Sequence, residues 1–266
     1  MVSPTAIAGL KRRSRKRGRL FLVGAGPGDP GLLTRRAEER ISQAEVIMFD
    51  ALVSPEVLAL APSTARLIPV GKVAGNPGIG QEGINWLIRK FLRRGLVVVR
   101  LKGGDPMVFG RAAEEIQAGI GAGFHVDVVP GISSYSAASA SFLMPVTRRE
   151  VASGFWVITA TNANADLNPD IELAAKSTST VIILMGLHKI ERIGELFARY
   201  RSPEEPVAVC SRVSLPDESI MVGTAENIAQ LCLHQSVASP ALIVVGQCVA
   251  HMQRSELRSM FHSASQ

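Results

Sequence analysis

The chain has 266 residues, a formal net charge of +6, and three cysteines without a close-spaced pair. This length allows two α/β lobes or one large one, and the cysteine pattern argues against both a disulfide framework and a zinc site. No apolar run reaches the roughly 18 residues that span a bilayer, and no signal-peptide pattern is present, so we expect a cytoplasmic protein.

The positive charge is concentrated near the N-terminus, where seven of the nine residues from 11 to 19 are basic. The rest of the chain is close to neutral, which argues against a global nucleic-acid footprint. Three interpretations of the basic run stay open: an arm for nucleic acid or anionic membranes, part of a transit peptide, and a disordered, solvated leader. We assign residues 1–18 to a basic disordered leader.

From residue 19 onward, short apolar segments alternate with amphipathic ones. Strands are expected at 20–23, 45–49, 67–70, 97–101 and 126–129. Helices are expected at 34–44, with Thr34 as a possible cap, at 81–94 and at 112–122. The helix at 81–94 carries an apolar face formed by Ile84, Leu87, Ile88, Phe91 and Leu92. This alternation predicts a parallel sheet with right-handed crossovers.

A second set of elements follows Pro130 and Gly131. It contains a small-residue helix at 133–142, strands at 155–159, 181–184, 207–210 and 241–245, and helices near 188–199 and 225–234. Because the strand count restarts, we expect an N-terminal α/β domain (19–131), a C-terminal α/β domain (132–250) and a tail (251–266). The fold class is α/β with mainly parallel sheets, and the active site is expected in the cleft between the domains.

The loop after the fourth strand is the most informative stretch, and it reads RLKGGDPMVFGR from Arg100 to Arg111. Gly103 and Gly104 allow positive φ and a close approach of the backbone to a ligand, while Pro106 removes a donor. A strand that ends in this way lies where open α/β sheets bind ligands. The alternative is a tight strand-to-helix turn without a ligand.

The loop 24–28, GAGPG, follows the first strand and suggests dinucleotide binding, with Asp50 at the end of the next strand. The fingerprint fails in detail, because position 29 is Asp29 rather than glycine. Pro27 and Pro30 also interrupt the start of a helix that would cradle a pyrophosphate. A P-loop is excluded, since no Lys-Ser/Thr pair follows. A nucleotide-like ligand is compatible with these residues, whereas a phosphate cradle is not.

Multi-residue motifs occur in order over about residues 19–250: VGAGPGDPGLLT (23–34), MFDALVSPEVLAL (48–60), RLKGGDPMVFGR (100–111), VVPGISS (128–134), PVTRR (145–149), LMGL (184–187) and PALIVVG (240–246). Together they resemble the tetrapyrrole (corrin/porphyrin) methyltransferase family. The resemblance implies two α/β domains, a homodimer, and S-adenosylmethionine bound in the cleft between the domains. The branch that the chain resembles most methylates uroporphyrinogen III at two pyrrole carbons, giving precorrin-2 for sirohaem or cobalamin synthesis.

The resemblance also implies roles for individual residues. Asp50 and Lys72 align with the family's proton acceptor and donor, although Asp50 could instead cap the segment 52–60. The candidates for binding the carboxylate-rich acceptor are Arg111, Glu114, Arg148 and Arg149. The cofactor contacts fall on Pro27, Gly103, Gly104, Asp105, Val108, Ser133, Ser134, Met185, Val213 and Ala241. No metal, nucleic-acid or membrane partner is implied.

The chain departs from the family pattern at positions expected in the cleft. These are Ala112 and Ala113 in place of two glycines, Tyr135 in place of a small residue, Arg148 in place of a histidine, Ala160-Thr161 where a histidine is frequent, and Cys210–Val213 in place of an acidic-Asn-small run. These departures leave the identity of the methyl acceptor undecided. The alternatives are another precorrin or tetrapyrrole C-methyltransferase, a methylase of a translation factor or of RNA, and a cofactor-binding homologue without activity.

Overall fold

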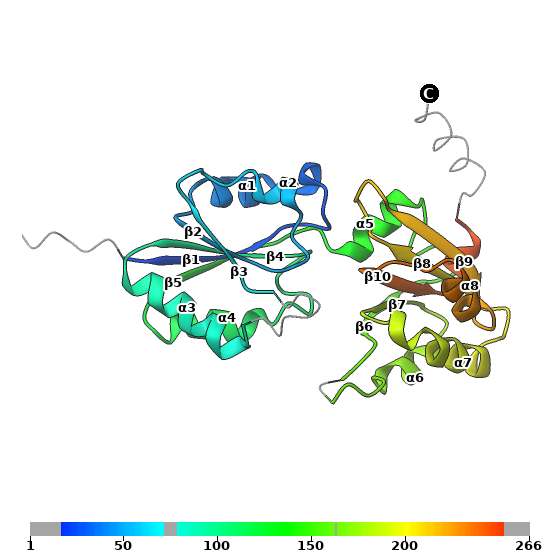
Figure 1. Cartoon of the computed structure of the whole chain (residues 1–266). Coiled ribbons are helices and arrows are strands. Elements are labelled where there is room, and N and C mark those ends of the chain that lie inside the picture. Colours follow the sequence, from blue (N-terminus) through cyan, green and yellow to red (C-terminus); the bar gives the residue numbers. More distant parts are fainter. Residues whose placement is uncertain (1–16, 72–78, 163, 253–266) are drawn as a thin grey trace, which may run out of the picture.

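The computed structural model describes residues 17–71, 79–162 and 164–252. In this part of the chain, two five-stranded sheets form two lobes that the segment 130–133 joins (Figure 1). The sheets lie on either side of the boundary predicted at 131. Most of the basic leader, the end of the tail and the candidate proton donor Lys72 lie outside the described residues.

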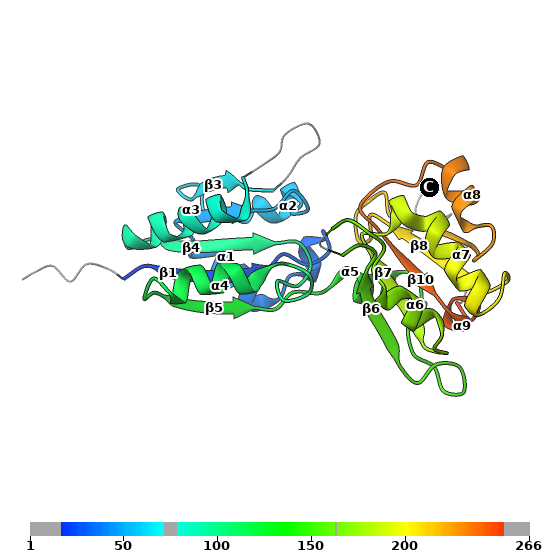
Figure 2. The ribbon, with the colours of Figure 1, turned by 90° about the horizontal axis from the view of Figure 1, so that it is seen from below.

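The N-terminal lobe contains a parallel sheet whose strands lie in the order β3-β2-β4-β1-β5. Its strands are β1 (Arg19–Gly24), β2 (Val46–Phe49), β3 (Arg66–Pro69), β4 (Val97–Lys102) and β5 (His125–Val129). The strands run in one direction, so the loops that follow them meet at one edge. The carboxyl ends of β4 and β5 point toward the C-terminal lobe (Figure 2).

Helices cover both faces of this sheet, and they are α1 (Arg35–Ser42), α2 (Pro55–Leu58), α3 (Gln81–Arg93) and α4 (Ala112–Ile120). The alternation of β1 separates the two faces: Phe21 and Val23 pack with α1 and α2, whereas Leu20 and Leu22 pack with α3 and α4. Thr34 caps α1, as its sequence position predicts, because its hydroxyl accepts a hydrogen bond from the backbone N–H of Ala37 at 3.2 Å.

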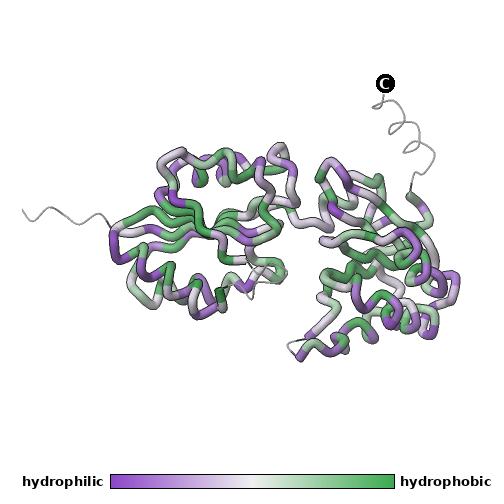
Figure 3. Tube along the Cα trace, in the orientation of Figure 1, coloured by the Kyte–Doolittle hydropathy of each residue, from purple (hydrophilic) through white to green (hydrophobic). Residues whose placement is uncertain are grey.

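The C-terminal lobe holds a mixed sheet in the order β6-β7-β10-β8-β9. Its strands are β6 (Phe155–Thr159), β7 (Thr180–Leu184), β8 (Pro206–Ser211), β9 (Ser219–Thr224) and β10 (Ala241–Val245). Its helices are α5 (Ser134–Ser141), α6 (Asp170–Ala175), α7 (Ile190–Tyr200), α8 (Ile228–His234) and α9 (Gln247–Ala250). Apolar residues follow the strands of both sheets through the interior (Figure 3).

The expectation of mainly parallel sheets is confirmed for the N-terminal sheet and wrong for the C-terminal one. There, β6 pairs with β7 in parallel, whereas the β7–β10, β10–β8 and β8–β9 pairs are antiparallel. The short connection between β8 and β9 permits only an antiparallel pair, because parallel strands need a long crossover. The strand β9 was not predicted from the sequence; its apolar run is only three residues long (220–222), and none of its residues is fully buried.

No helix in the described part of the chain is both long enough and apolar enough to cross a bilayer.

Candidate functional site

A cavity of about 510 Å³ lies between the two lobes. The N-terminal lobe contributes the loops after β1, β2 and β4, and the C-terminal lobe contributes the start of α5, the end of β7, the loop after β8 and the start of β10. Such a volume is typical of small-molecule sites, which run from ~300 to ~1,000 Å³. The cavity lies where the sequence predicts a cleft.

Glycines allow the loops after β1, β4 and β5 to touch beneath this cavity. The backbone N–H of Gly104 donates to the carbonyl oxygen of Gly26 at 2.7 Å, and the N–H of Gly26 donates back at 3.3 Å. A Cβ on Gly24 or on Gly131 would lie 2.7 Å or 2.2 Å from the carbonyl oxygen of Gly104, which is too close for any side chain. The tight junction therefore requires glycine.

Gly104 also leaves space on its cavity side. Its φ is +66°, and the nearest heavy atom to a Cβ built there would be the Cα of Ser133 at 3.9 Å. The backbone of Gly104 is thus open to a ligand, as expected from the sequence. Asp105 holds the loop in this position, because its carboxylate accepts hydrogen bonds from the N–H of Met107 at 2.8 Å and of Gly131 at 3.0 Å.

Four charged side chains form a cluster beside the cavity. Arg100 and Lys102 of β4 are 2% and 3% exposed, Glu115 of α4 is fully buried, and the Asp50 side chain after β2 is 28% exposed. Arg100 Nε donates to Glu115 Oε1 at 2.9 Å, and a second nitrogen of the guanidinium pairs with Asp50. Lys102 Nζ donates to both oxygens of Glu115, at 3.2 and 3.1 Å. Two cations and two carboxylates balance one another, as buried charges require.

Burial lowers the pKa of Lys102 below its ordinary value, and the neighbouring Arg100 lowers it further, while Glu115 acts in the opposite direction. Asp50 and Lys102 line the cavity, whereas Arg100 and Glu115 hold them from behind. Asp50 is not a helix cap, because Ser54 caps α2 through a hydrogen bond from the N–H of Val57 at 3.3 Å. The capping interpretation of Asp50 is therefore wrong.

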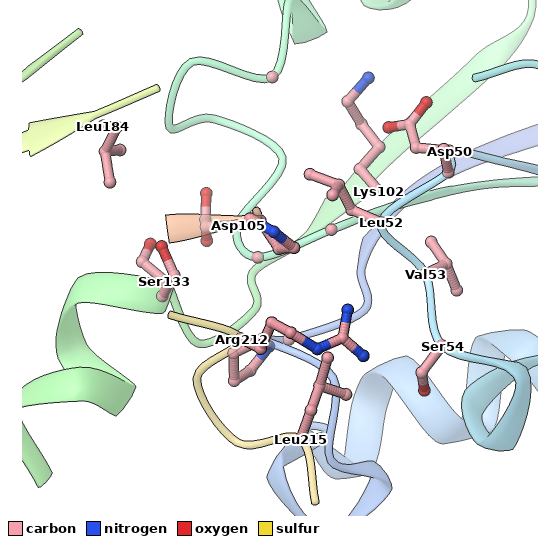
Figure 4. Close-up of a pocket in the computed structure, with 18 of the residues that line it drawn as sticks. Asp50, Leu52, Val53, Ser54, Lys102, Asp105, Ser133, Leu184, Arg212 and Leu215 are labelled. Atoms are coloured by element: carbon pink, nitrogen blue, oxygen red, sulfur yellow. The ribbon is translucent and has the colours of Figure 1, made fainter. Parts of the chain in front are cut away.

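The C-terminal wall of the cavity contains two non-glycine residues with left-handed backbone, which is uncommon and concentrates at functional sites. Met185 follows β7 with φ of +56°, and Arg212 follows β8 with φ of +49°. Met185 is 56% exposed, so it is a residue of the cavity surface rather than of the core. Leu184, Arg212 and Leu215 extend into the space opposite the N-terminal loops (Figure 4).

All of the predicted cofactor contacts except Val213 line the cavity: Pro27, Gly103, Gly104, Asp105, Val108, Ser133, Ser134, Met185 and Ala241. Val213 packs instead in the core of the C-terminal lobe. Among the predicted substrate-binding residues, Arg111 and Glu114 form an exposed ion pair of 2.9 Å next to the cavity residue Gly110. Arg148 and Arg149 are exposed and are not among the lining residues.

Sequence reasoning missed several residues of the site, namely Arg100, Lys102, Ser54, Glu115, Arg212 and Leu215. Ser54 joins α2 to the loop after β1, since its hydroxyl donates to the carbonyl oxygen of Gly28 at 2.7 Å. A signal existed for Lys102, which ends a buried strand directly before the paired glycines, and for Arg212, which lies in a departure from the family pattern.

Comparison with known proteins gives one consistent family. The family described as Tetrapyrrole (Corrin/Porphyrin) Methylases matches residues 19–229. Siroheme synthase 3 of Aeromonas hydrophila is 43% identical over 237 residues, which are 89% of this chain and 50% of that protein. Siroheme synthase of a Psychrobacter species is 42% identical over 86% of this chain and 47% of its own length. The chain therefore spans about half the length of these curated relatives.

Solved structures agree with this result. Uroporphyrin III C-methyl transferase from Thermus thermophilus is 37% identical, with a TM-score of 0.76 over 88% of this chain and 100% of that one. The same Thermus protein complexed with S-adenyl homocysteine matches equally well, with a TM-score of 0.76. A cobalt precorrin-4 methyltransferase, 24% identical, shares the fold with a TM-score of 0.79 over 87% of this chain and 95% of that one.

Proposed function

The chain belongs to the tetrapyrrole (corrin/porphyrin) methylase family, and from that premise we propose that it methylates uroporphyrinogen III at two pyrrole carbons, giving precorrin-2. The methyl donor is S-adenosylmethionine. The observation that best supports the proposal is the cavity between the lobes, because nearly all residues implied as cofactor contacts line it. The Thermus relative of 37% identity, whose structure holds S-adenyl homocysteine, supports the same donor.

The residues of the cavity fit this donor. Gly103 and Gly104 expose backbone without side chains, as close contact with the donor's polar groups requires. Leu184, Met185 and Ala241 provide an apolar wall for a flat ring system. When bound, S-adenosylmethionine supplies a methyl group that its sulfonium already activates.

The protein's own contribution is mainly alignment of the acceptor, since a pyrrole carbon is itself electron-rich. Positioning of this kind supplies up to about 7–11 kcal/mol of the acceleration. Arg111 binds acceptor carboxylates at the rim of the cavity, where 63% of its side chain is exposed. Asp50, held by Arg100, takes the proton that the macrocycle releases.

A second methyl acceptor should be tested in the same assay. Arg148 and Arg149 do not line the cavity, so two of the expected carboxylate-binding residues are missing from its surface. A methylated precorrin, or another tetrapyrrole with a different arrangement of carboxylates, is therefore the alternative acceptor. The homodimer implied by the resemblance stays a prediction.

The test is to incubate the purified protein with S-adenosylmethionine and anaerobic uroporphyrinogen III, and to determine the mass of the tetrapyrrole product. A gain of two methyl groups supports the proposal. The matched control is Asp50→Asn, which keeps the shape of the side chain but removes its basicity. No gain with uroporphyrinogen III, together with methylation of a precorrin, would replace the proposed acceptor with the alternative one.

A further inference from the structure

Two cations, Lys102 and Arg212, occur among the described residues that line the cavity, and they differ in how they are held. Lys102 is buried and donates to both oxygens of Glu115, so its charge is already matched. Arg212 lies 2.5 Å, from Nε to Oδ2, from Asp217, whose side chain is 60% exposed. Because water screens a carboxylate as exposed as that of Asp217, its pair with Arg212 is weak, and Arg212 is the cation that a ligand can recruit.

The position of Arg212 is fixed at its backbone. Its N–H donates to the carbonyl oxygen of Pro240 at 2.8 Å, and its carbonyl oxygen accepts from the N–H of Leu215 at 3.0 Å. Ser214, two residues on, accepts a hydrogen bond from the N–H of Asp29 at 3.1 Å, which ties this turn to the N-terminal lobe. The long side chain therefore starts from a rigid point at the junction of the lobes.

The choice of residue at this point is informative. A φ of +49° favours glycine or asparagine, and an arginine there is strained. The guanidinium extends across the cavity toward Val53 and Ser54 of the N-terminal lobe (Figure 4). Its Nε is buried and pairs with Asp217, whereas no hydrogen bond engages its other two nitrogens within the described residues. A strained arginine with incompletely used donors points to a role for the side chain in binding.

We propose that Arg212 binds a carboxylate of the ligand in the cavity and that Asp217 holds the guanidinium until this ligand arrives. The proposal rests on the proposed function for the nature of the ligands. A carboxylate inside the cavity offers Arg212 a bidentate pair that is better shielded from water than its pair with Asp217. Two ligands carry such a group: the methionyl part of S-adenosylmethionine and the acidic side chains of the tetrapyrrole.

The competing explanation is that the Arg212–Asp217 pair only braces the loop after β8. In that case, Arg212→Gln and Asp217→Asn break the same contact and have the same effect. If Arg212 is a ligand-binding residue, the two variants diverge. Arg212→Gln weakens binding of the carboxylate-bearing ligand by roughly tenfold or more, whereas Asp217→Asn leaves it equal or tighter, because a competitor for the guanidinium is gone.

The experiment measures affinities by calorimetry for S-adenosylhomocysteine and for 5′-methylthioadenosine, which lacks the methionyl carboxylate, and KM for anaerobic uroporphyrinogen III. Melting temperatures close to that of the unmodified protein verify that each variant is folded. If Arg212→Gln lowers the affinity for S-adenosylhomocysteine but not for 5′-methylthioadenosine, the donor supplies the carboxylate. If it raises KM for the tetrapyrrole alone, the acceptor supplies it.

Arg212→Lys provides a finer control, since it keeps the charge and loses the bidentate geometry of the guanidinium. Its affinity for the carboxylate-bearing ligand should lie between those of the unmodified protein and Arg212→Gln. Unchanged affinities and an unchanged KM in Arg212→Gln, or equal losses in Arg212→Gln and Asp217→Asn, would overturn the proposal. The binding measurements do not depend on the acceptor. An Arg212-dependent affinity for S-adenosylhomocysteine in a protein that fails to methylate uroporphyrinogen III would refute the proposed function and leave this inference intact.

Discussion

Removing the charge of Glu115 is the sharpest perturbation that the site offers. Glu115 is fully buried on α4 and accepts hydrogen bonds from Arg100 Nε at 2.9 Å and from Lys102 Nζ at 3.2 and 3.1 Å. Glu115→Gln keeps the volume of the side chain and one acceptor oxygen, but the two buried cations then face Asp50 alone. The neighbouring Glu114→Gln is a matched control, because that carboxylate is exposed and pairs with the exposed Arg111.

The expected loss follows from the burial of the partners. Breaking a buried ion pair by removing one member destabilises a protein by about 3–5 kcal/mol. Because glutamine still accepts one hydrogen bond, we expect the lower end, about 3 kcal/mol of unfolding free energy. For a chain of this size, that is a fall in melting temperature of roughly 6–12 °C. The exposed control should lose about 1 kcal/mol or less.

The pH dependence of stability gives an independent readout. Lys102 has a pKa in the folded protein that burial and Arg100 hold below the ordinary value. The folded state therefore binds fewer protons than the unfolded state between these two pKa values, and stability rises with pH across that window. Glu115 raises the pKa of Lys102, so Glu115→Gln widens the window toward lower pH.

The assay is thermal and urea unfolding of the unmodified protein, Glu115→Gln and Glu114→Gln at about pH 7 and about pH 9. We expect Glu115→Gln to regain more stability than the other two proteins as the pH rises. Adding Lys102→Met to Glu115→Gln should restore part of the loss, because it removes one unmatched cation. Equal melting temperatures for Glu115→Gln and Glu114→Gln would refute the idea that a buried charge cluster supports the cavity.

Three further perturbations test the site. Gly104→Val should abolish binding of S-adenosylhomocysteine, measured by calorimetry, in a folded protein. The control is Gly123→Val, because Gly123 has a similar φ of +79° and open space around it but lies away from the cavity, so this change should affect only stability. Equal binding by both variants would contradict the placement of the ligand over Gly104. Asp50→Asn should slow single-turnover methyl transfer and leave S-adenosylhomocysteine affinity unchanged; normal turnover would exclude it as the proton acceptor. Ser54→Ala should lower unfolding free energy by about 1 kcal/mol, since it removes the cap of α2, and an unchanged melting curve would count against that role.

The sequence predicts the N-terminal lobe well because its signals are local. Val97, Val98 and Val99 form an uninterrupted β-branched run that only a buried strand accommodates, and all three are buried in β4. The order of the C-terminal sheet could not be predicted, because pairing direction depends on which strands meet and not on their composition. β10 inserts between β7 and β8, and nothing in residues 241–245 specifies that place.

The candidate site divides in the same way. Backbone positions such as Gly103 and Gly104 could be predicted because a glycine pair after a buried strand allows close approach of a ligand, and the family resemblance favoured this interpretation over a tight turn without a ligand. The charged cluster was not, since Asp50 and Arg100 are 50 residues apart in sequence and meet only because β2 and β4 are neighbours in the sheet. Val213 was assigned to the cofactor by alignment, but its side chain lies in the core, and the preceding residue faces the cavity.

The antiparallel pair β8–β9 explains why the residues around Val213 lie at the cavity although the side chain of Val213 does not. A parallel strand after β8 would carry the chain away over a crossover, whereas the short β8–β9 connection turns the chain back at the cavity. The turn leaves Arg212 and Ser214 with left-handed backbone and brings Leu215 against Gly28, where a Cβ would lie 2.6 Å from Leu215 Cδ2. This contact between Leu215 and Gly28 holds the turn that carries Arg212 against the N-terminal lobe, beside the cavity. Arg212 therefore lies at the cavity because β8 ends there, and the antiparallel return to β9 keeps the following residues of the turn at the same place.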